Sequence, residues 1–461
     1  MKKRVNIFQN DFLVLSPENI NYEDLAKSNE KLNLNIPKGI IGDIIKILAK
    51  NHSFDEKDQL GQRRKIIDYK VSLCSVLLHE IYGNDYKQGI KMLIVKHLFK
   101  YPYSESNCYK YMLNDKTRSF NLKIEKLETK TTKGRGIVKR IKEQDVKTSS
   151  VIKKKFNYMI KFFNDKKLKI DLEECINIIE QEYLKTNNYI NYLADFQKVI
   201  NIHNGLYKFH NNPETDSRLH SNFTFLNKKF RKHLTYDGKK IVEIDLSNSI
   251  PTIFSFLLSN SINVNIKSII NTILYDYLLM FNKKSKDVDI YEIELFNKLC
   301  VEGKIYEELT KGFLKENINH LMNDYDGYID ESGYHFDEEF DKTKITKSSF
   351  LSMLFSENET FINMEIAFEK MFPSIFNFIK EIKRKGSYKL FSHFLFQIES
   401  EIVLNQIARS FNALQNGKVP IFTIHDCVCT TEGNELILED FIKKRTIELF
   451  GVQLNYKIKY L

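Results

Sequence analysis

Two short strand-like runs near the C-terminus, separated by a polar pair, constrain the fold of this chain most strongly. Residues 421–424 and 427–431 are rich in Ile, Phe, Val and Thr, which favour β-strands. His425 and Asp426 lie between the runs, where the chain must reverse, so the pattern predicts a β-hairpin with this pair at its tip. An Asp at the tip of a rigid hairpin is well placed to hold a metal ion.

A second strand-like run ends in a carboxylate far upstream. Residues 239–245 favour a strand and end at Asp245, and residues 246–251 carry helix-start signals, with Ser and Asn as caps and Pro just inside. Two strand-end carboxylates can together hold a pair of divalent ions and promote in-line phosphoryl transfer. Taken singly, each Asp is more simply explained as the end of a strand or a cap, so the assignment depends on its neighbours.

Further motifs flank these two aspartates in a definite order. They are, along the chain, Ser217-Arg218-Leu219, Phe230-Arg231-Lys232, the first strand with Asp245, Lys347-Ser348-Ser349-Phe350, Phe372-Pro373, Gln397 within a helical stretch, and the His425-Asp426 hairpin. This order resembles the polymerase domain of family A DNA polymerases and, more distantly, the phage-type single-subunit RNA polymerases. The resemblance covers residues 213–461, and it rests on the order of the motifs more than on any one of them.

The resemblance implies an α+β fold: a right-hand polymerase with an antiparallel-sheet palm, helical fingers and thumb, plus a mainly helical N-terminal region. The expected parts are a helical N-terminal region of unknown role (1–115), a basic, flexible segment that contacts nucleic acid (116–155), thumb-like helices (156–212), palm with the first metal Asp (213–258), fingers (259–385) and palm with the His-Asp hairpin (386–461). Apolar periodicity places helices at residues 69–79, 88–98, 170–183 and 190–202. Phe372-Pro373 is expected to be structural, as a break between two helices of the fingers.

For the chemistry, the resemblance implies two Mg²⁺ ions, for which Mn²⁺ can substitute. Their expected ligands are Asp245, Asp426 and the backbone carbonyl of Leu246, because Mg²⁺ prefers hard oxygen donors. Glu243 and Glu432 are alternative carboxylates, and Glu243 would share a strand face with Asp245.

Nucleotide contacts are expected mainly from a fingers helix. Lys347 is predicted to reach the triphosphate, and Lys342 or Lys344 is expected in place of an Arg that this chain lacks. Phe355 or Phe350 is expected to stack on the incoming base. Family members that make DNA carry a Glu five residues after the first metal Asp, where it crowds the sugar 2′ position. This chain has Ile250 there, and its bulk favours deoxynucleotides.

Contacts to the primer and template are expected from four residues. Arg218 and Arg231 are suited to the duplex backbone or to minor-groove acceptors that nearly all base pairs share. Gln397 and His425 resemble the family's residues at the template and the primer terminus. For Gln397, one polar face of a helix spanning residues 394–409 is the simpler alternative.

The positive charge of the chain is concentrated in one segment. Between Lys116 and Lys155 there are 14 Lys and Arg against 4 Asp and Glu, a balance of +10 that equals the net charge of the whole chain. Such a segment suits phosphate contact, and Gly134-Arg135-Gly136 predicts a flexible point within it. A solvated linker or a helix face is the alternative.

The amino-acid composition indicates the class of protein and the cellular compartment to expect. Hydrophobic residues make up 42% of the chain, which indicates a globular protein. Six cysteines without a Cys-x-x-Cys pair predict free thiols in a reducing, intracellular and cytoplasmic setting, and no apolar run is long enough to span a bilayer, so no membrane partner is expected.

The leading function is therefore template-directed DNA synthesis from dNTPs on a primer-template, by a compact phage- or mobile-element-like relative of the family. Two alternatives stay open. One is RNA synthesis or priming, which a ribonucleotide incorporation assay separates from DNA synthesis. The other is a nucleic-acid-binding polymerase derivative that is no longer catalytic.

Overall fold

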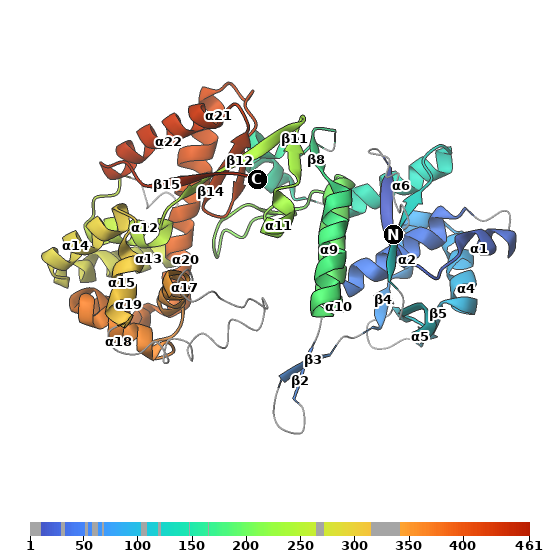
Figure 1. The fold of residues 1–461 in the computed structure, drawn as a ribbon, viewed down its shortest axis with the longest axis horizontal. Coiled ribbons are helices and arrows are strands. Elements are labelled where there is room, and N and C mark those ends of the chain that lie inside the picture. Colours follow the sequence, from blue (N-terminus) through green and yellow to red (C-terminus); the bar gives the residue numbers. More distant parts are fainter. Residues whose placement is uncertain are drawn as a thin grey trace. The chain divides into compact units, whose positions relative to one another are not determined.

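The structure is a computed structural model (Figure 1), and its described residues divide into two compact units. It describes residues 11–28, 33–50, 54–57, 63–66, 69–102, 108–118, 121–146, 148–164, 166–263, 272–314 and 342–461. The first unit contains the chain up to His210, residues His220–Lys240 and Leu461, and the second contains Asn211–Leu219 and Ile241–Tyr460. Each unit is treated by itself below.

The first unit combines short strands with helices. Its strands are β1 (Phe12–Pro17), β2 (Phe54–Lys57), β3 (Arg63–Ile66), β4 (Val71–Leu73), β5 (Leu98–Tyr101), β6 (Tyr109–Leu113), β7 (Leu122–Leu127), β8 (Leu168–Ile170), β9 (Phe209–His210), β10 (His220–Ser221) and β11 (Leu234–Tyr236). Its helices are α1 (Tyr22–Ser28), α2 (Asn35–Leu48), α3 (Ser75–Tyr82), α4 (Tyr86–Lys96), α5 (Asp115–Arg118), α6 (Thr132–Asp145), α7 (Ser150–Lys155), α8 (Asn157–Ile160), α9 (Leu172–Thr186), α10 (Tyr189–His203) and α11 (Lys228–Arg231).

The N-terminal region is mixed, which corrects the expectation that it is mainly helical. β1 pairs with β7, and β4, β6 and β5 form a three-stranded sheet in that order. These strands are only three to six residues long, so each is too short to give a clear periodic signal in the sequence. The helices predicted at residues 69–79 and 88–98 are present in part, as α3 and α4.

The basic segment is folded, which corrects the predicted flexible point. Gly134 and Gly136 lie in the first turns of α6, which Thr131 caps by accepting a hydrogen bond from the Gly134 amide. A Cβ at Gly134 would lie 2.0 Å from the carbonyl oxygen of Glu128, so glycine is needed here for close packing instead of flexibility. Several cations of the segment are paired within the unit, for example Lys123 with Glu125 at 2.9 Å.

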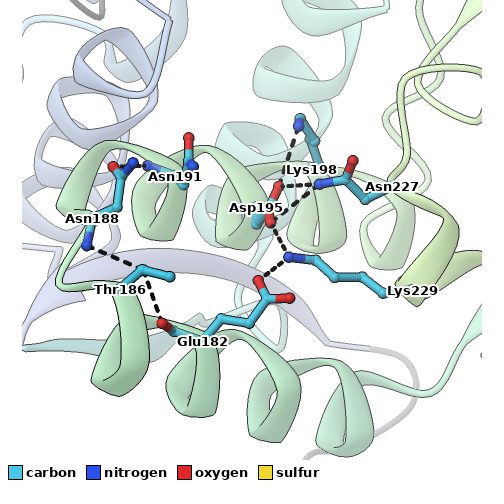
Figure 2. Close-up of polar contacts among 8 residues, drawn as sticks. All are labelled: Glu182, Thr186, Asn188, Asn191, Asp195, Lys198, Asn227 and Lys229. Carbon is cyan, nitrogen blue, oxygen red and sulfur yellow. Dashed lines mark hydrogen bonds and ion pairs between the residues drawn. The ribbon is translucent and has the colours of Figure 1, made fainter. Parts of the chain in front are cut away.

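The helices predicted at residues 170–183 and 190–202 are confirmed as α9 and α10. A buried polar network joins this helical pair to α11 (Figure 2). Asp195 on α10 is 5% exposed and accepts from Lys229 at 2.8 Å and from Asn227 at 3.1 Å. Lys229 also pairs with Glu182 on α9, so one ammonium group bridges both helices.

The second unit contains a small antiparallel sheet and most of the longer helices. Its strands are β12 (Lys239–Leu246), whose first two residues belong to the first unit, β13 (Phe422–Ile424), β14 (Cys427–Thr431) and β15 (Tyr456–Tyr460). Its helices are α12 (Ser249–Leu258), α13 (Thr272–Lys284), the 3₁₀ turn η2 (Ser285–Asp287), α14 (Ile290–Val301), α15 (Ile305–Leu314), α17 (Lys342–Phe355), α18 (Ile362–Met371), α19 (Pro373–Gly386), α20 (Tyr388–Ser400), the π-helical η3 (Glu401–Arg409), α21 (Ser410–Leu414) and α22 (Glu435–Phe450).

The sheet of the second unit confirms the predicted strand at residues 239–245 and the predicted hairpin. Its order is β13-β14-β12-β15, and every pair is antiparallel, as are the described strand pairs of the first unit, which confirms an α+β fold with antiparallel sheets. η3 continues α20 and packs on β13 and β14, so one long helical element supports the hairpin (Figure 1).

An aromatic core holds the helices of this unit. Phe254 on α12 packs edge-on against Phe281, Phe296 and Phe391 from α13, α14 and α20, at centroid distances of 6.3, 5.9 and 5.6 Å. The predicted break at Phe372-Pro373 is confirmed, because α18 ends at Met371 and α19 begins at Pro373. Among the described residues, no helix has both the length and the apolar character needed to cross a membrane.

Candidate active site

Strand pairing brings the two distant aspartates together. Asp245 lies near the end of β12, directly opposite Cys427, the first residue of β14. Asp426 immediately precedes Cys427, so it lies beside Asp245. One ligand atom each of Asp245, Asp426 and Cys427 lies within 4.8 Å of the others. The carboxylate pair expected from the sequence is therefore present at one end of the sheet.

The hairpin tip holds an uncommon backbone conformation. His425 is exposed and has a φ of 56°, in the left-handed region that few residues other than glycine occupy. A two-residue turn between antiparallel strands requires such a conformation at its first position. The tight turn thus fixes the backbone directly before Asp426, and it keeps the His425 side chain at the surface.

A hydroxyl and an ion pair lie behind Asp426. Ser249, in the first turn of α12, donates to Glu399 Oε1 at 2.6 Å and lies 3.3 Å from Asp426 Oδ2. Glu399 on α20 is 1% exposed, and its second oxygen pairs with the Arg218 guanidinium. Four residues distant in the sequence thus form one connected network around the candidate metal ligand.

The segment that carries Arg218 is itself anchored to α20. Gln397 is 1% exposed, and its side-chain amide donates to the carbonyl oxygens of Pro213 and Thr215 at 2.9 and 3.2 Å. The Asn211 side chain donates to the carbonyl oxygen of Arg218 at 3.0 Å. This corrects the expectation that Gln397 touches the template: its donors position the backbone that presents Arg218.

The charges of the cluster do not balance. Three carboxylates (Asp245, Asp426 and Glu399) face two cations, Arg218 and Lys459. Burial, Glu399 and Asp245 together raise the pKa of Asp426, and Arg218 offsets this only in part. The site therefore carries excess negative charge that a divalent cation would neutralise.

The donor set fits a hard metal ion. Burial and the neighbouring carboxylates, first of all that of Asp426, raise the pKa of Cys427 far above its ordinary value, so its thiol stays protonated and is a poor ligand. Asp245 and Asp426 then remain as oxygen donors, which Mg²⁺ and Mn²⁺ prefer. Leu246, the other predicted ligand, is the last residue of β12, next to Asp245.

Lys459 on β15 is a member of the site that sequence reasoning missed. It stands opposite Glu243 in the ladder, and its Nζ lies 2.8 Å from Asp245 Oδ2. Burial lowers the pKa of Lys459, but the pairing with Asp245 outweighs this and the pKa ends above the ordinary value. This ammonium neutralises a carboxylate that is also a candidate metal ligand.

Lys347 is connected to the cluster through a buried tyrosine. It is exposed on α17, and its Nζ lies 5.7 Å from the centre of the Tyr306 ring. Tyr306 on α15 is 5% exposed, and burial, Cys300 and the charge of Asp426 all raise its pKa. Tyr306, another residue that the sequence did not indicate, therefore lies within electrostatic reach of Asp426 and in ring contact with Lys347.

Two predicted nucleotide contacts are corrected by burial. Phe350 is 0% exposed and packs against Tyr306 and Phe368, so its ring belongs to the core and is not available for a base. Ile250 is 6% exposed in the first turn of α12, which removes the argument that its bulk faces the sugar 2′ position.

Phe355 remains a candidate for base stacking. It is half-buried and contacts Phe396 at 4.7 Å between ring centres. The Arg218 guanidinium lies over the other ring of this pair, 4.7 Å from the centre of Phe396. Lys344 is exposed on α17, one turn before Lys347.

Arg231 and Glu432 do not belong to this cluster. Arg231 is 7% exposed in the first unit and donates to the carbonyl oxygens of Leu226 and Thr224 at 2.7 and 3.2 Å. It holds a local turn, which corrects its assignment to duplex contact. Glu432 follows Thr431 at the end of the β14 ladder opposite to Asp245, so it is excluded as an alternative carboxylate.

Comparison with known proteins gives a distant likeness to solved structures. No family model and no curated protein matches the chain. Among solved structures, the POL domain of Pol1 from M. smegmatis, in complex with DNA primer-template and dNTP, is similar at 11% sequence identity and a TM-score of 0.33. The match covers 62% of this chain and 55% of that chain, so this chain spans about half the length of the solved one. The functional argument therefore depends on the geometry of the site.

Proposed function

We propose that the chain is a nucleotidyltransferase that extends a primer on a template, with DNA synthesis from dNTPs as its reaction. The observation that carries the proposal is the pair formed by Asp245 and Asp426. The two lie 181 positions apart in the sequence, yet their ligand atoms lie within 4.8 Å of each other at one end of a sheet. Two Mg²⁺ ions held there would stabilise the attacking 3′-oxygen and the leaving pyrophosphate oxygen.

Different residues would bind the metal ions, the triphosphate and the primer-template. Asp245, Asp426 and the carbonyl of Leu246 hold the ions, and the exposed ammonium of Lys347 binds the triphosphate. Arg218 is fixed by Glu399 and by the anchored segment that carries it, so its remaining N–H groups can present a rigid donor to the primer-template. His425, exposed at the hairpin tip, is suited to the primer terminus.

In this proposal the parts of the chain keep the roles expected from the sequence. Residues 213–258 and 386–461 are palm, residues 259–385 are fingers, and α9 and α10 are the thumb-like pair. The basic segment 116–155 contributes an additional grip on phosphates through its exposed cations, which include Lys153–Lys155 on α7.

Ile250 is buried and therefore does not select the sugar of the nucleotide. Ribonucleotide incorporation by the same site is therefore the second candidate. A non-catalytic derivative is disfavoured, because the chain retains both aspartates and holds their ligand atoms within 4.8 Å of each other.

Primer extension tests the proposal directly. The full chain is assayed with dNTPs or NTPs on DNA and RNA templates, alongside Asp426→Asn and the matched control Asp440→Asn, whose side chain is 62% exposed on α22. We expect extension with dNTPs, a loss of about 100-fold or more for Asp426→Asn, and unchanged activity for the control. Full activity of Asp426→Asn would overturn the proposal.

A further inference from the structure

Two of the six cysteines face each other at the edge of the N-terminal sheet. β4 and β6 pair with the register Val71↔Tyr111, Ser72↔Lys110 and Leu73↔Tyr109. One step further along the same register places Cys74 opposite Cys108. Directly opposed residues on antiparallel strands have Cα atoms about 4.5–5.5 Å apart, within the roughly 4.4–6.8 Å that a disulfide bridges.

The side chains agree with this register. Cys108 lowers the pKa of Cys74 and Cys74 raises that of Cys108, which places the two thiols near each other. Both residues are half-exposed, whereas Cys175, Cys300, Cys427 and Cys429 are buried. A reagent in solution can therefore reach this pair and is excluded from the other four cysteines.

The two thiols are chemically unequal. Cys74 is the N-cap of α3, and the backbone amides of Leu77 and Val76 lower the pKa of its thiol. Burial and the nearby Cys74 raise the pKa of Cys108. Cys74 therefore ionises more readily than Cys108, which makes Cys74 the attacking thiol and Cys108 the resolving thiol, because the thiolate form is the nucleophile in disulfide exchange.

A pocket next to the pair suits an anionic reagent. It has a volume of about 520 Å³ and opens beside Cys108. Its lining combines apolar side chains with tyrosines and three cations, Lys87, Lys91 and Lys100. Cys108 lines the pocket, and so do Leu73 and Ser75, the two neighbours of Cys74 in the chain. Lys100 lies 3.6 Å from the centre of the Tyr109 ring, so one cation is held at the wall of the pocket.

We propose that Cys74 and Cys108 form a reversible thiol–disulfide site that reacts with small anionic disulfides, such as glutathione disulfide, through this pocket. The Cys74 thiolate attacks one sulfur of the reagent, its S–S bond breaks, and one glutathione thiolate leaves. Cys108 then loses its proton and attacks the mixed disulfide at Cys74, which releases the second glutathione. In total, two protein thiols are oxidised to one disulfide while glutathione disulfide is reduced to two glutathione molecules. The bond would join the two ends of a segment that contains α3, α4 and β5.

The test uses the full chain in glutathione buffers that range from reducing to oxidising, followed by acid quenching, alkylation and peptide mapping. We expect a linked Cys74–Cys108 peptide in oxidising buffer and its loss on return to reducing buffer. Cys108→Ser should stop at a mixed disulfide between Cys74 and glutathione, and Cys74→Ser should leave Cys108 several-fold less reactive than Cys74. Two free thiols at equilibrium in oxidising buffer, or equal reactivity of Cys108 in Cys74→Ser, would overturn the proposal.

A second arm tests the pocket. Lys91→Met combined with Lys100→Met should slow the reaction with glutathione disulfide and leave the rate with neutral hydroxyethyl disulfide unchanged. The Lys444→Met variant, at an exposed lysine of α22, is the control for a general charge effect. Equal slowing with both reagents, or slowing in the control, would contradict recognition of the anion by the pocket.

Discussion

Glu399 provides the sharpest test of the site, because its carboxylate joins Ser249 and Arg218 behind Asp426. In Glu399→Gln the shape is kept and the charge is lost, so the Arg218 guanidinium faces an amide instead of a carboxylate. A hydrogen bond to a charged group contributes about 1.5–3 kcal/mol, and breaking a fully buried ion pair costs about 3–5 kcal/mol. The Glu399 side chain is 2% exposed and that of Arg218 is 19% exposed. We therefore expect a loss of about 2–3 kcal/mol in the free energy of unfolding of the second unit.

The measurement is urea unfolding, combined with hydrogen exchange of the amides in β12 and β14, which reports this unit separately. The control is Glu448→Gln, which breaks the exposed pair between Glu448 and Arg445 on α22 and should cost less than about 1 kcal/mol. Arg218→Met combined with Glu399→Gln should recover part of the loss, because no unpaired guanidinium is left buried.

The Glu399→Gln variant should also change the pH dependence of activity. Glu399 is one of the causes that raise the pKa of Asp426, so its neutralisation should lower that pKa toward the ordinary value. If activity requires the Asp426 carboxylate, the acidic limb of the pH–rate profile should move to lower pH in Glu399→Gln. A loss of stability no larger than that of Glu448→Gln, together with an unmoved acidic limb, would refute the network as described.

Four further predictions concern the charges of the site and of the basic segment. In the folded chain the pKa of Asp426 lies above its ordinary value, so the fold loses stability as the pH rises from the ordinary pKa to the raised one. Asp426→Asn should therefore raise the free energy of unfolding at pH 7, as measured by urea titration. Lys459→Met should lower the Mg²⁺ concentration needed for half-maximal extension, because the ammonium competes with the ion for a carboxylate; a higher requirement would count against this. Lys347→Met should raise the KM for dNTP and lower kcat in steady-state extension while leaving primer-template affinity unchanged, whereas Lys344→Met should do less. Replacing Lys153–Lys155 by Gln should reduce the slope of log K against log salt by up to about 3 on duplex DNA, as measured by fluorescence anisotropy.

Local patterns in the sequence predicted the elements that carry the site. The hairpin around His425-Asp426, the strand that ends at Asp245 and the break at Phe372-Pro373 all follow from composition and from the spacing of turn residues. The juxtaposition of the two aspartates was also accessible, because strand-end carboxylates on neighbouring strands of one sheet must lie close together. The short strands of the N-terminal region were missed, since three-residue strands carry no periodic signal.

Burial decided the residues that sequence reasoning assigned wrongly. Gln397, Arg231 and Phe350 were placed by motif order, yet each is nearly or fully buried, and its side chain serves the fold. A sequence motif gives the position of a residue but not the direction of its side chain. Lys459 and Tyr306 were missed for the same reason, because only the tertiary fold brings β15 to Asp245 and α15 to Lys347.

The electrostatics of the cluster link its stability to its proposed chemistry. A half-buried Asp426 beside Asp245 and Glu399 is destabilising in the ion-free fold, and the chain offsets this with Arg218 on one side and Lys459 on the other. The two cations differ in an important way. Arg218 is bound to Glu399 and held by an anchored segment, whereas the Lys459 side chain is 43% exposed and pairs directly with a candidate metal ligand. Mg²⁺ binding to Asp245 would displace the Lys459 ammonium from this carboxylate. The displacement costs little free energy, because Lys459 is exposed and pairs with one carboxylate only. Arg218, in contrast, can keep Glu399 neutralised whether or not an ion is bound, and this keeps the position of Ser249 and Asp426 constant through a catalytic cycle.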